Sequence, residues 1–121
     1  MGEIATSERQ ITLFYQSKSS RGKKTLAYAV AEGVPILEVD ILKTPLTGTQ
    51  IAELAARLEI PVSGLVNSQH AAYMGKFASK EFSENDWITI LRKNPEMIRQ
   101  PIALRGNKTI LVETPSDIIK I

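Results

Sequence analysis

The spacing of apolar and polar positions along the chain predicts a mixed α/β fold. Residues 11–15 (ITLFY) form a short apolar, β-branched run typical of a buried strand, and residues 36–41 (ILEVDI) alternate as a second strand. Between them, residues 24–32 carry apolar side chains at helical spacing, and Gly33 and Pro35 are placed to end that helix. A strand, a helix and a strand within about thirty residues predict a βαβ unit with parallel strands and a right-handed crossover.

The middle of the chain predicts helices. Thr47 and Gln50 have the spacing of a capping box at the start of a helix with one apolar stripe, which extends to Leu58. Ser83 is placed to cap a further helix through Leu91, whose first turn contains an acid. Several helices therefore follow the βαβ unit.

The last third of the chain returns to strands. Residues 102–104 and 109–112 read as two strands around a tight Gly-Asn turn, which predicts an antiparallel hairpin, and residues 114–116 begin a final helix. The order is strand, helix, strand, several helices, two strands and a helix. It predicts a single α/β domain over residues 11–121, with a mixed sheet covered by helices, after a flexible N-terminal tail over residues 1–10.

Composition excludes several kinds of chemistry. The chain of 121 residues contains no cysteine, which excludes disulfides, thiolate catalysis and cysteine-ligated metals, and His70 is its only histidine. We therefore expect no metal site and no cofactor. The apolar runs are too short for a transmembrane helix, and the first ten residues lack the apolar region of a signal peptide. A cytoplasmic protein without membrane contact is the expectation.

Positive charge is unevenly distributed. The net charge is only +2, which does not argue for nucleic acid, and we expect no direct nucleic-acid binding. From Arg9 to Ala31, however, there are five basic residues and no acidic one. Four of them surround the loop between the first strand and the first helix.

That loop, Ser17–Lys24, is a candidate anion site. A helix N-terminus offers unpaired N–H groups and the positive end of a dipole, to which serines, a glycine and cations add donors. The candidate ligand-binding residues are Ser17, Lys18, Ser19, Ser20, Arg21, Gly22 and Lys23. The alternative is a basic turn whose charges extend into water. Ser19 itself is either a nucleophile, which needs a base that the sequence does not pair with it, or the cap of the helix.

Four segments carry a resemblance to a known family. They are residues 11–26 (ITLFYQSKSSRGKKTL), 39–58 (VDILKTPLTGTQIAELAARL), 94–104 (NPEMIRQPIAL) and 106–119 (GNKTILVETPSDII). Together they resemble the arsenate reductases and the Spx-like regulators over nearly the whole chain. The resemblance implies a thioredoxin-like fold with a mixed four-stranded sheet flanked by helices.

The functional residues of that family are replaced. Its reductases carry a loop of the form H-N-P-x-C-x-x-S, and the matching residues here are Tyr15, Gln16, Ser17, Ser19 and Gly22. The nucleophilic cysteine thus falls on Ser19, so we assign no catalytic residue. The three arginines that hold the oxyanion in the reductases fall on Asn67, Gln100 and Thr114. The C-x-x-C redox switch of the regulators would fall on Ser19 and Gly22, and it cannot form.

Pro101 precedes the strand that faces the active-site loop in thioredoxin-like folds. The resemblance therefore implies a cis Gln100–Pro101 bond, although most X–Pro bonds are trans. It also implies that Gln100 points toward the loop at residues 17–22, as a neutral substitute for the family arginine.

Two functional hypotheses follow. The first is a catalytically degenerate protein, expected to be a monomer, that works by binding. Its ligand at Ser17–Lys24 would be a protein partner, as for a regulator, or a small anion or glutathione-type molecule. The alternative is an enzyme with a non-thiol mechanism around Ser19. Elsewhere, three aromatic residues are expected to pack in the core or between helices, and three basic residues to form a solvated helix face: Tyr28, Phe77 and Trp87, and Arg92, Lys93 and Arg99.

Overall fold

The computed structural model describes residues 4, 6–67 and 81–121 of the chain. The chain forms two compact units, Ile4–Pro45 with Gln100–Ile121, and Leu46–Arg99. The single domain predicted over residues 11–121 stays a prediction, and within it residues 46–99 form a compact unit of their own. His70 and Phe77 lie outside the described residues.

The first unit is built on a four-stranded mixed sheet. Its strands are β1 (Ile11–Tyr15), β2 (Ile36–Asp40), β3 (Ile102–Arg105) and β4 (Lys108–Leu111). Their order is β2-β1-β3-β4, with β1 parallel to β2 and antiparallel to β3, and β3 antiparallel to β4. The predicted βαβ unit, hairpin and mixed sheet are therefore confirmed. The apolar strand β1 is central and buried along its whole length, whereas the alternating strand β2 lies at an edge.

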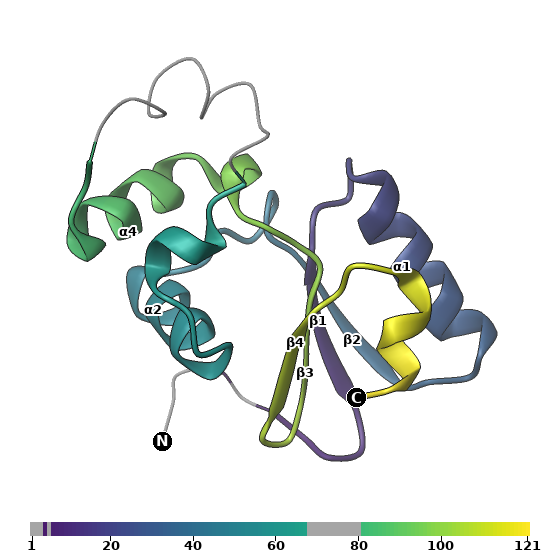
Figure 1. Ribbon diagram of the computed structural model, residues 1–121. Helices are drawn as coiled ribbons and strands as arrows, with labels where there is room; N and C mark the ends of the chain where they lie inside the picture. The colour runs from purple at the N-terminus through teal and green to yellow at the C-terminus, as the bar shows by residue number, and fades with distance from the viewer. Residues whose placement is uncertain (1–3, 5, 68–80) are drawn as a thin grey trace. The chain divides into compact units, whose positions relative to one another are not determined.

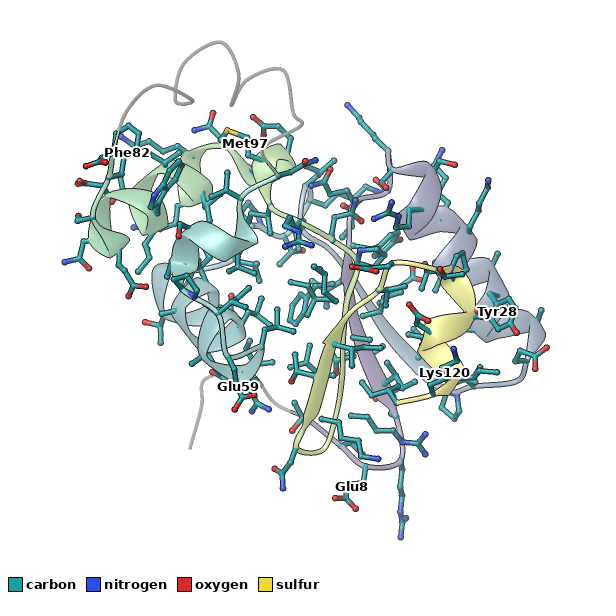
Figure 2. The ribbon with its side chains drawn as sticks, viewed as in Figure 1. Glu8, Tyr28, Glu59, Phe82, Met97 and Lys120 are labelled. Carbon is teal, nitrogen blue, oxygen red and sulfur yellow. The ribbon has the colours of Figure 1, made fainter. Side chains whose placement is uncertain are left out.

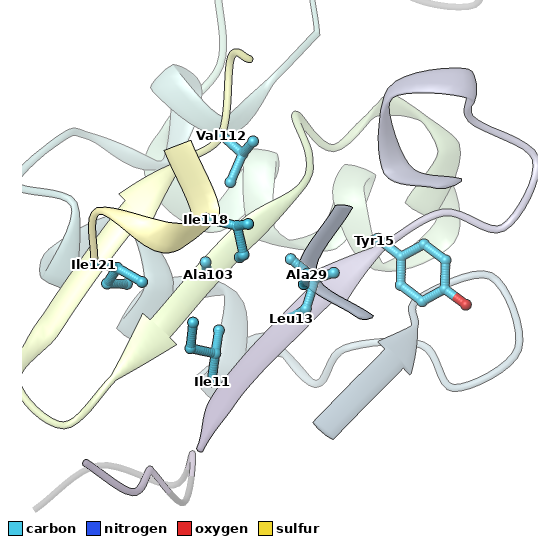
Figure 3. Packing of buried hydrophobic residues seen from close by; sticks show 8 residues of the cluster. All are labelled: Ile11, Leu13, Tyr15, Ala29, Ala103, Val112, Ile118 and Ile121. Atoms are coloured by element: carbon cyan, nitrogen blue, oxygen red, sulfur yellow. The ribbon is translucent and has the colours of Figure 1, made fainter. Parts of the chain in front are cut away.

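One face of this sheet is covered by two helical elements. They are α1 (Ser20–Ala31) and the 3₁₀-helix η3 (Pro115–Ile119), which lie side by side (Figure 1). Alternate residues of β1 point toward them, because successive side chains of a strand face opposite sides. The resulting buried cluster contains Ile11, Leu13, Tyr15, Ala29, Ala103, Val112, Ile118 and Ile121 (Figure 3). Tyr28 of α1 packs against its edge, as predicted.

The segment before β1 contacts the hairpin. The carbonyl oxygen of Ser7 accepts a hydrogen bond from the N–H of Gly106 at 3.0 Å, and that of Glu8 accepts one from Nε of Arg105 at 2.7 Å. Gly106 has a φ of +57°, which suits the tight turn predicted between β3 and β4. These two hydrogen bonds join Ser7 and Glu8 to the hairpin, and the flexible tail over residues 1–10 stays a prediction.

The second unit is helical in its described residues. Its elements are α2 (Gly48–Arg57), η1 (Val62–Leu65), α4 (Glu84–Lys93) and η2 (Pro95–Met97). The predicted capping box of Thr47 and Gln50 is present, and Ser83 caps α4 as expected. Trp87 is buried and packs edge-on against Phe82, with ring centroids 4.9 Å apart.

The basic side chains of this unit lie at its surface. Arg92 and Lys93 on α4 and Arg99 after η2 are exposed, as predicted for a solvated face. Within the described residues, no helix is long and apolar enough to cross a membrane. The same part of the chain contains no group of three or more metal-binding side chains.

Candidate functional site

Ser19 lies at the start of α1, in the loop that follows β1. Its backbone is extended (φ −87°, ψ 129°), and its Oγ accepts a hydrogen bond from the N–H of Gly22 at 3.2 Å. Its carbonyl oxygen accepts the first intrahelical bond, from the N–H of Lys23 at 3.0 Å. Ser19 is therefore the N-cap of α1, the structural one of its two predicted roles.

Gln100, which lies just before β3, contacts this loop through its side chain. The Gln100–Pro101 bond is cis, as the resemblance implied. The Oε1 atom of Gln100 accepts a hydrogen bond from the N–H of Gln16 at 3.2 Å, across 84 positions of sequence. The side chain thus points toward the loop at residues 17–22, in the expected direction. It presents a neutral acceptor where the reductase family carries a cationic donor.

Gly22 is buried and closely surrounded. A Cβ at this position would lie 3.0 Å from Oε1 of Gln100, 3.0 Å from the carbonyl oxygen of Gln16 and 3.2 Å from Cδ2 of Tyr15. Such distances are shorter than nine in ten real Cβ contacts, so a larger residue here would force these neighbouring atoms to move by a few tenths of an ångström. The structure therefore gives a steric reason for glycine at a position where the family carries serine or cysteine. Gly22 was predicted as a ligand contact, and here its N–H is already bonded to Ser19.

Asp40, at the end of β2, holds the other side of the loop. Its Oδ1 accepts hydrogen bonds from the N–H of Ser17 at 3.3 Å and from the N–H of Leu42 at 3.0 Å. Burial works to raise the pKa of Asp40, but the hydrogen bonds from Ser17 and Leu42 and the charge of Lys43 hold this pKa below its ordinary value. Its second oxygen, Oδ2, is buried and has no hydrogen-bond partner among the described residues.

Sequence reasoning missed Asp40. The available signal was an acid in the last position of a strand expected to be parallel to β1, because the carboxyl ends of parallel strands meet at one edge of a sheet. In the structure, Asp40 is paired in register with Tyr15, the last residue of β1. Burial, followed by the charges of Glu38 and Asp40, raises the pKa of the Tyr15 hydroxyl. The Tyr15 hydroxyl therefore stays protonated and uncharged at neutral pH.

In the loop that was predicted to bind an anion, three main-chain N–H groups already have acceptors. The main-chain N–H groups of Gln16, Ser17 and Gly22 donate to Gln100, Asp40 and Ser19, as described above. The N–H groups of Ser20 and Arg21, in the first turn of α1, have no acceptor among the described residues. Four cations surround this turn, all exposed to solvent: Lys18, Arg21, Lys23 and Lys24. The N–H groups without an acceptor therefore belong to the first turn of α1 and not to the loop before it.

The other two positions that match family arginines, Thr114 and Asn67, each donate a main-chain hydrogen bond. Thr114 lies directly before η3, and its N–H donates to Oδ2 of Asp117 at 3.0 Å. Asn67 belongs to the second unit, where its N–H donates to the carbonyl oxygen of Met97 at 2.7 Å.

The sheet order, the helix between two parallel strands and the cis proline directly before β3 define a thioredoxin-like fold. No family model matches the sequence, and no curated protein matches it significantly. Solved structures do match. Arsenate reductase from Vibrio cholerae superposes with a TM-score of 0.84 at 16% identity, over 95% of this chain and 99% of that chain. An arsenate reductase related protein from Brucella melitensis superposes with a TM-score of 0.73 at 14% identity, over 93% of this chain and 94% of that chain.

These likenesses establish the fold. Both cover almost the whole of each chain, so the arsenate-reductase-like fold expected from the four sequence segments is confirmed. Identities of 14% and 16% do not transfer an activity. What the site does must be argued from its own residues.

Proposed function

We propose that this chain is a catalytically degenerate relative of the arsenate reductases that works by binding rather than by thiol redox chemistry. The observation that carries the proposal is the state of Ser19. The position that matches the family's nucleophilic cysteine holds a hydroxyl, and this hydroxyl caps α1 by accepting the N–H of Gly22. A hydroxyl forms no mixed disulfide and cannot enter the sulfur oxidation ladder, and the chain has no thiol elsewhere.

The surroundings of Ser19 support the same conclusion. Gln100 offers an amide oxygen where the family offers an arginine, and Asp40 adds a carboxylate to the loop. The oxygen atoms that these two side chains direct at the loop are acceptors, which oppose an oxyanion there rather than stabilise one. Nothing in the described residues gives Ser19 a base, so no observation favours the alternative of a serine-based enzyme.

The proposed binding region is the segment Ser17–Lys24 on the side of the first turn of α1. The free N–H groups of Ser20 and Arg21 and the surrounding cations suit a small anion, a glutathione-type carboxylate or a negatively charged protein surface. We place this function in the cytoplasm and assign it to a monomer.

The absence of reductase activity is tested first. The purified protein should reduce no arsenate in an assay coupled to glutathione and glutaredoxin. The Ser19→Cys variant should gain a thiol that maleimide labels, yet still reduce no arsenate, because Asn67, Gln100 and Thr114 leave the oxyanion without its arginines. Ser83→Cys, which introduces a thiol at the cap of α4, is the matched control for labelling. Arsenate turnover by the unmodified chain would overturn the proposal.

Binding is tested by thermal unfolding. Phosphate should raise the melting temperature more than chloride at matched ionic strength, because it binds the folded state only. Arg21→Ala should abolish this difference, whereas Lys93→Ala, which removes one cation from α4, should preserve it. If both variants behave alike, the response reflects general charge and not the loop.

A further inference from the structure

Helix α1 has an outer face that its own fold does not use. The spacing of Lys23, Lys24, Ala27, Val30 and Ala31 places them on one stripe of the helix, and all five are exposed. Val30 is 66% exposed, the highest value among the exposed large hydrophobic residues of the described chain. We call this stripe the outer face of α1. In Figure 2, Tyr28 of α1 and Lys120, which follows η3, mark the side of the sheet on which this helix lies.

The outer face has two halves of different chemistry. Its first half is basic, with Lys23 and Lys24 beside Lys18 and Arg21 of the preceding turn. Its second half is apolar, although the exposed side of a surface helix is normally polar. From Lys23 to Val30 the face extends about 10 Å along the helix axis, which is two helical turns.

Within the described ranges, the cations of this face have no ion-pair partner. Among the residues that the structure describes, the ion pairs are Glu53–Arg57 at 2.8 Å and Asp117–Lys120 at 3.7 Å, and neither includes a residue of α1. In exposed helices, a basic side chain commonly forms an ion pair with an acidic one four positions away, as Arg57 does with Glu53 in α2. On α1 the corresponding positions after Lys23 and Lys24 are Ala27 and Tyr28.

The cations also oppose the dipole of their own helix. The first turn of α1 contains no acid and its last turn no base, so the positive charges gather at the positive end. Such an arrangement costs folding stability at low ionic strength. Neither packing nor helix stability therefore explains the outer face.

We propose that the outer face of α1 docks an acidic segment of another protein that also carries apolar side chains. This inference rests on the proposed binding function and specifies its partner. Carboxylates of the segment pair with the lysines, and its apolar side chains cover Ala27, Val30 and Ala31. An amphipathic helix with glutamates beside leucines presents both chemistries over two turns.

The two halves together favour a protein over a nucleic acid. A phosphate backbone would match the lysines but would leave the apolar half without a counterpart. The net charge of +2 is also small for a nucleic-acid binder. Apolar contact beside complementary charge is the usual composition of a protein interface.

The test uses the ¹⁵N-labelled full chain and synthetic probes. The first probe is a helical peptide with glutamates along one face and leucines beside them. Two matched peptides replace all glutamates with glutamine, or all leucines with serine. A DNA duplex and inorganic phosphate complete the set. Amide chemical shifts are followed up to about 1 mM peptide, at which even a millimolar Kd gives half saturation.

Matched charge variants locate the contact. Lys23→Glu/Lys24→Glu reverses two charges on α1, and Arg92→Glu/Lys93→Glu reverses two on α4 with the same change in net charge. Val30→Ser removes the apolar centre of the outer face. Lys23→Gln/Lys24→Gln is the neutral version, for use if the reversed pair does not fold.

The acidic amphipathic peptide should change the amide chemical shifts of residues 23–31. It should bind at least about tenfold more weakly to the α1 double variant, and its affinity for the α4 double variant should change little. Both matched peptides and Val30→Ser should also weaken binding. Equal losses in the two double variants, no shifts on α1, or tighter binding of DNA at the same amides would each overturn the inference. Shifts with phosphate confined to residues 17–22, without any from the peptide, would overturn it and still leave the proposed small-anion function standing.

Discussion

Helices α1 and α4 have nearly the same length and begin in the same way, yet they distribute charge in opposite senses. Both start at a serine whose Oγ accepts the N–H three positions later, at 3.2 Å for Ser19 and 3.1 Å for Ser83. Helix α4 has acids in its first turn and bases in its last, which is the arrangement that the helix dipole favours. Helix α1 has neither, and cations cluster at its start.

The two helices also differ in how their first turns are supported. In α4, Asp86 completes a capping box by accepting the N–H of Ser83 at 3.1 Å, so the support is local. In α1, the third position is Gly22, and the loop before the helix is held by Asp40 of β2 and Gln100 before β3. The start of α4 is therefore encoded within four residues, whereas the start of α1 depends on distant strands.

The largest expected effect concerns the packing of the α1 start. Gly22→Ala should lower the free energy of unfolding by about 1–3 kcal/mol, because its Cβ would overpack against Gln100, Gln16 and Tyr15. Asn85→Ala, in the exposed first turn of α4, should change it by less than about 0.5 kcal/mol. Urea unfolding measures both variants. Similar small values would mean that the α1 start is no more constrained than the α4 start.

The caps come next. Ser19→Ala and Ser83→Ala should each cost about 1 kcal/mol, because each leaves one N–H group without its acceptor. Aspartate at the two positions should have different effects on stability. Ser19→Asp should exceed wild-type stability, since its charge meets the cations of α1, whereas Ser83→Asp places a second acid beside Asp86 and should not. Chemical denaturation of the four variants provides the comparison, and equal gains from both aspartates would contradict it.

A smaller effect follows from charge reversal at the helix ends. Arg21→Glu should stabilise the protein by about 0.3–1 kcal/mol, because it places a negative charge at the positive N-terminal end of α1. Lys93→Glu should destabilise it by a similar amount, because it places a negative charge at the negative C-terminal end of α4. Both substitutions change the net charge equally. The two effects should shrink together as salt is added. Unfolding at low and high ionic strength checks the sign, and the same sign for both variants would refute the contrast.

The smallest effect concerns Asp40, the residue at the end of β2 that accepts a hydrogen bond from the loop before α1. Its folded-state pKa is lowered, so the stability it contributes is present above its ordinary value of 3.8 and is lost as the pH falls through the lowered folded-state value. Asp40→Asn should therefore reduce stability at neutral pH and flatten the decline below about pH 4. Unfolding curves for wild type and variant between neutral and acidic pH test this, and parallel acid limbs would exclude a role for Asp40.

Sequence reasoning reached those features that depend on neighbouring residues or on a family pattern. The capping box at Thr47, the cap at Ser83 and the hairpin turn at Gly106 each follow from residues within a few positions of one another. The strand β1 followed from an unbroken apolar run. The cis bond at Pro101 and the direction of Gln100 came from the resemblance, because no local pattern indicates either.

The sequence by itself determined the chemistry that this protein lacks and the order of its elements. A chain without cysteine performs no thiol chemistry whatever its fold, and periodicity alone predicted most of the strands and helices. Only the tertiary structure decided which donors of the Ser17–Lys24 loop are free. Asp40 meets Ser17 across 23 positions and Gln100 meets Gln16 across 84, because the strand register brings their ends together. Hydrogen bonds of this kind depend on distances of a few tenths of an ångström, and residue spacing along the chain does not encode such distances.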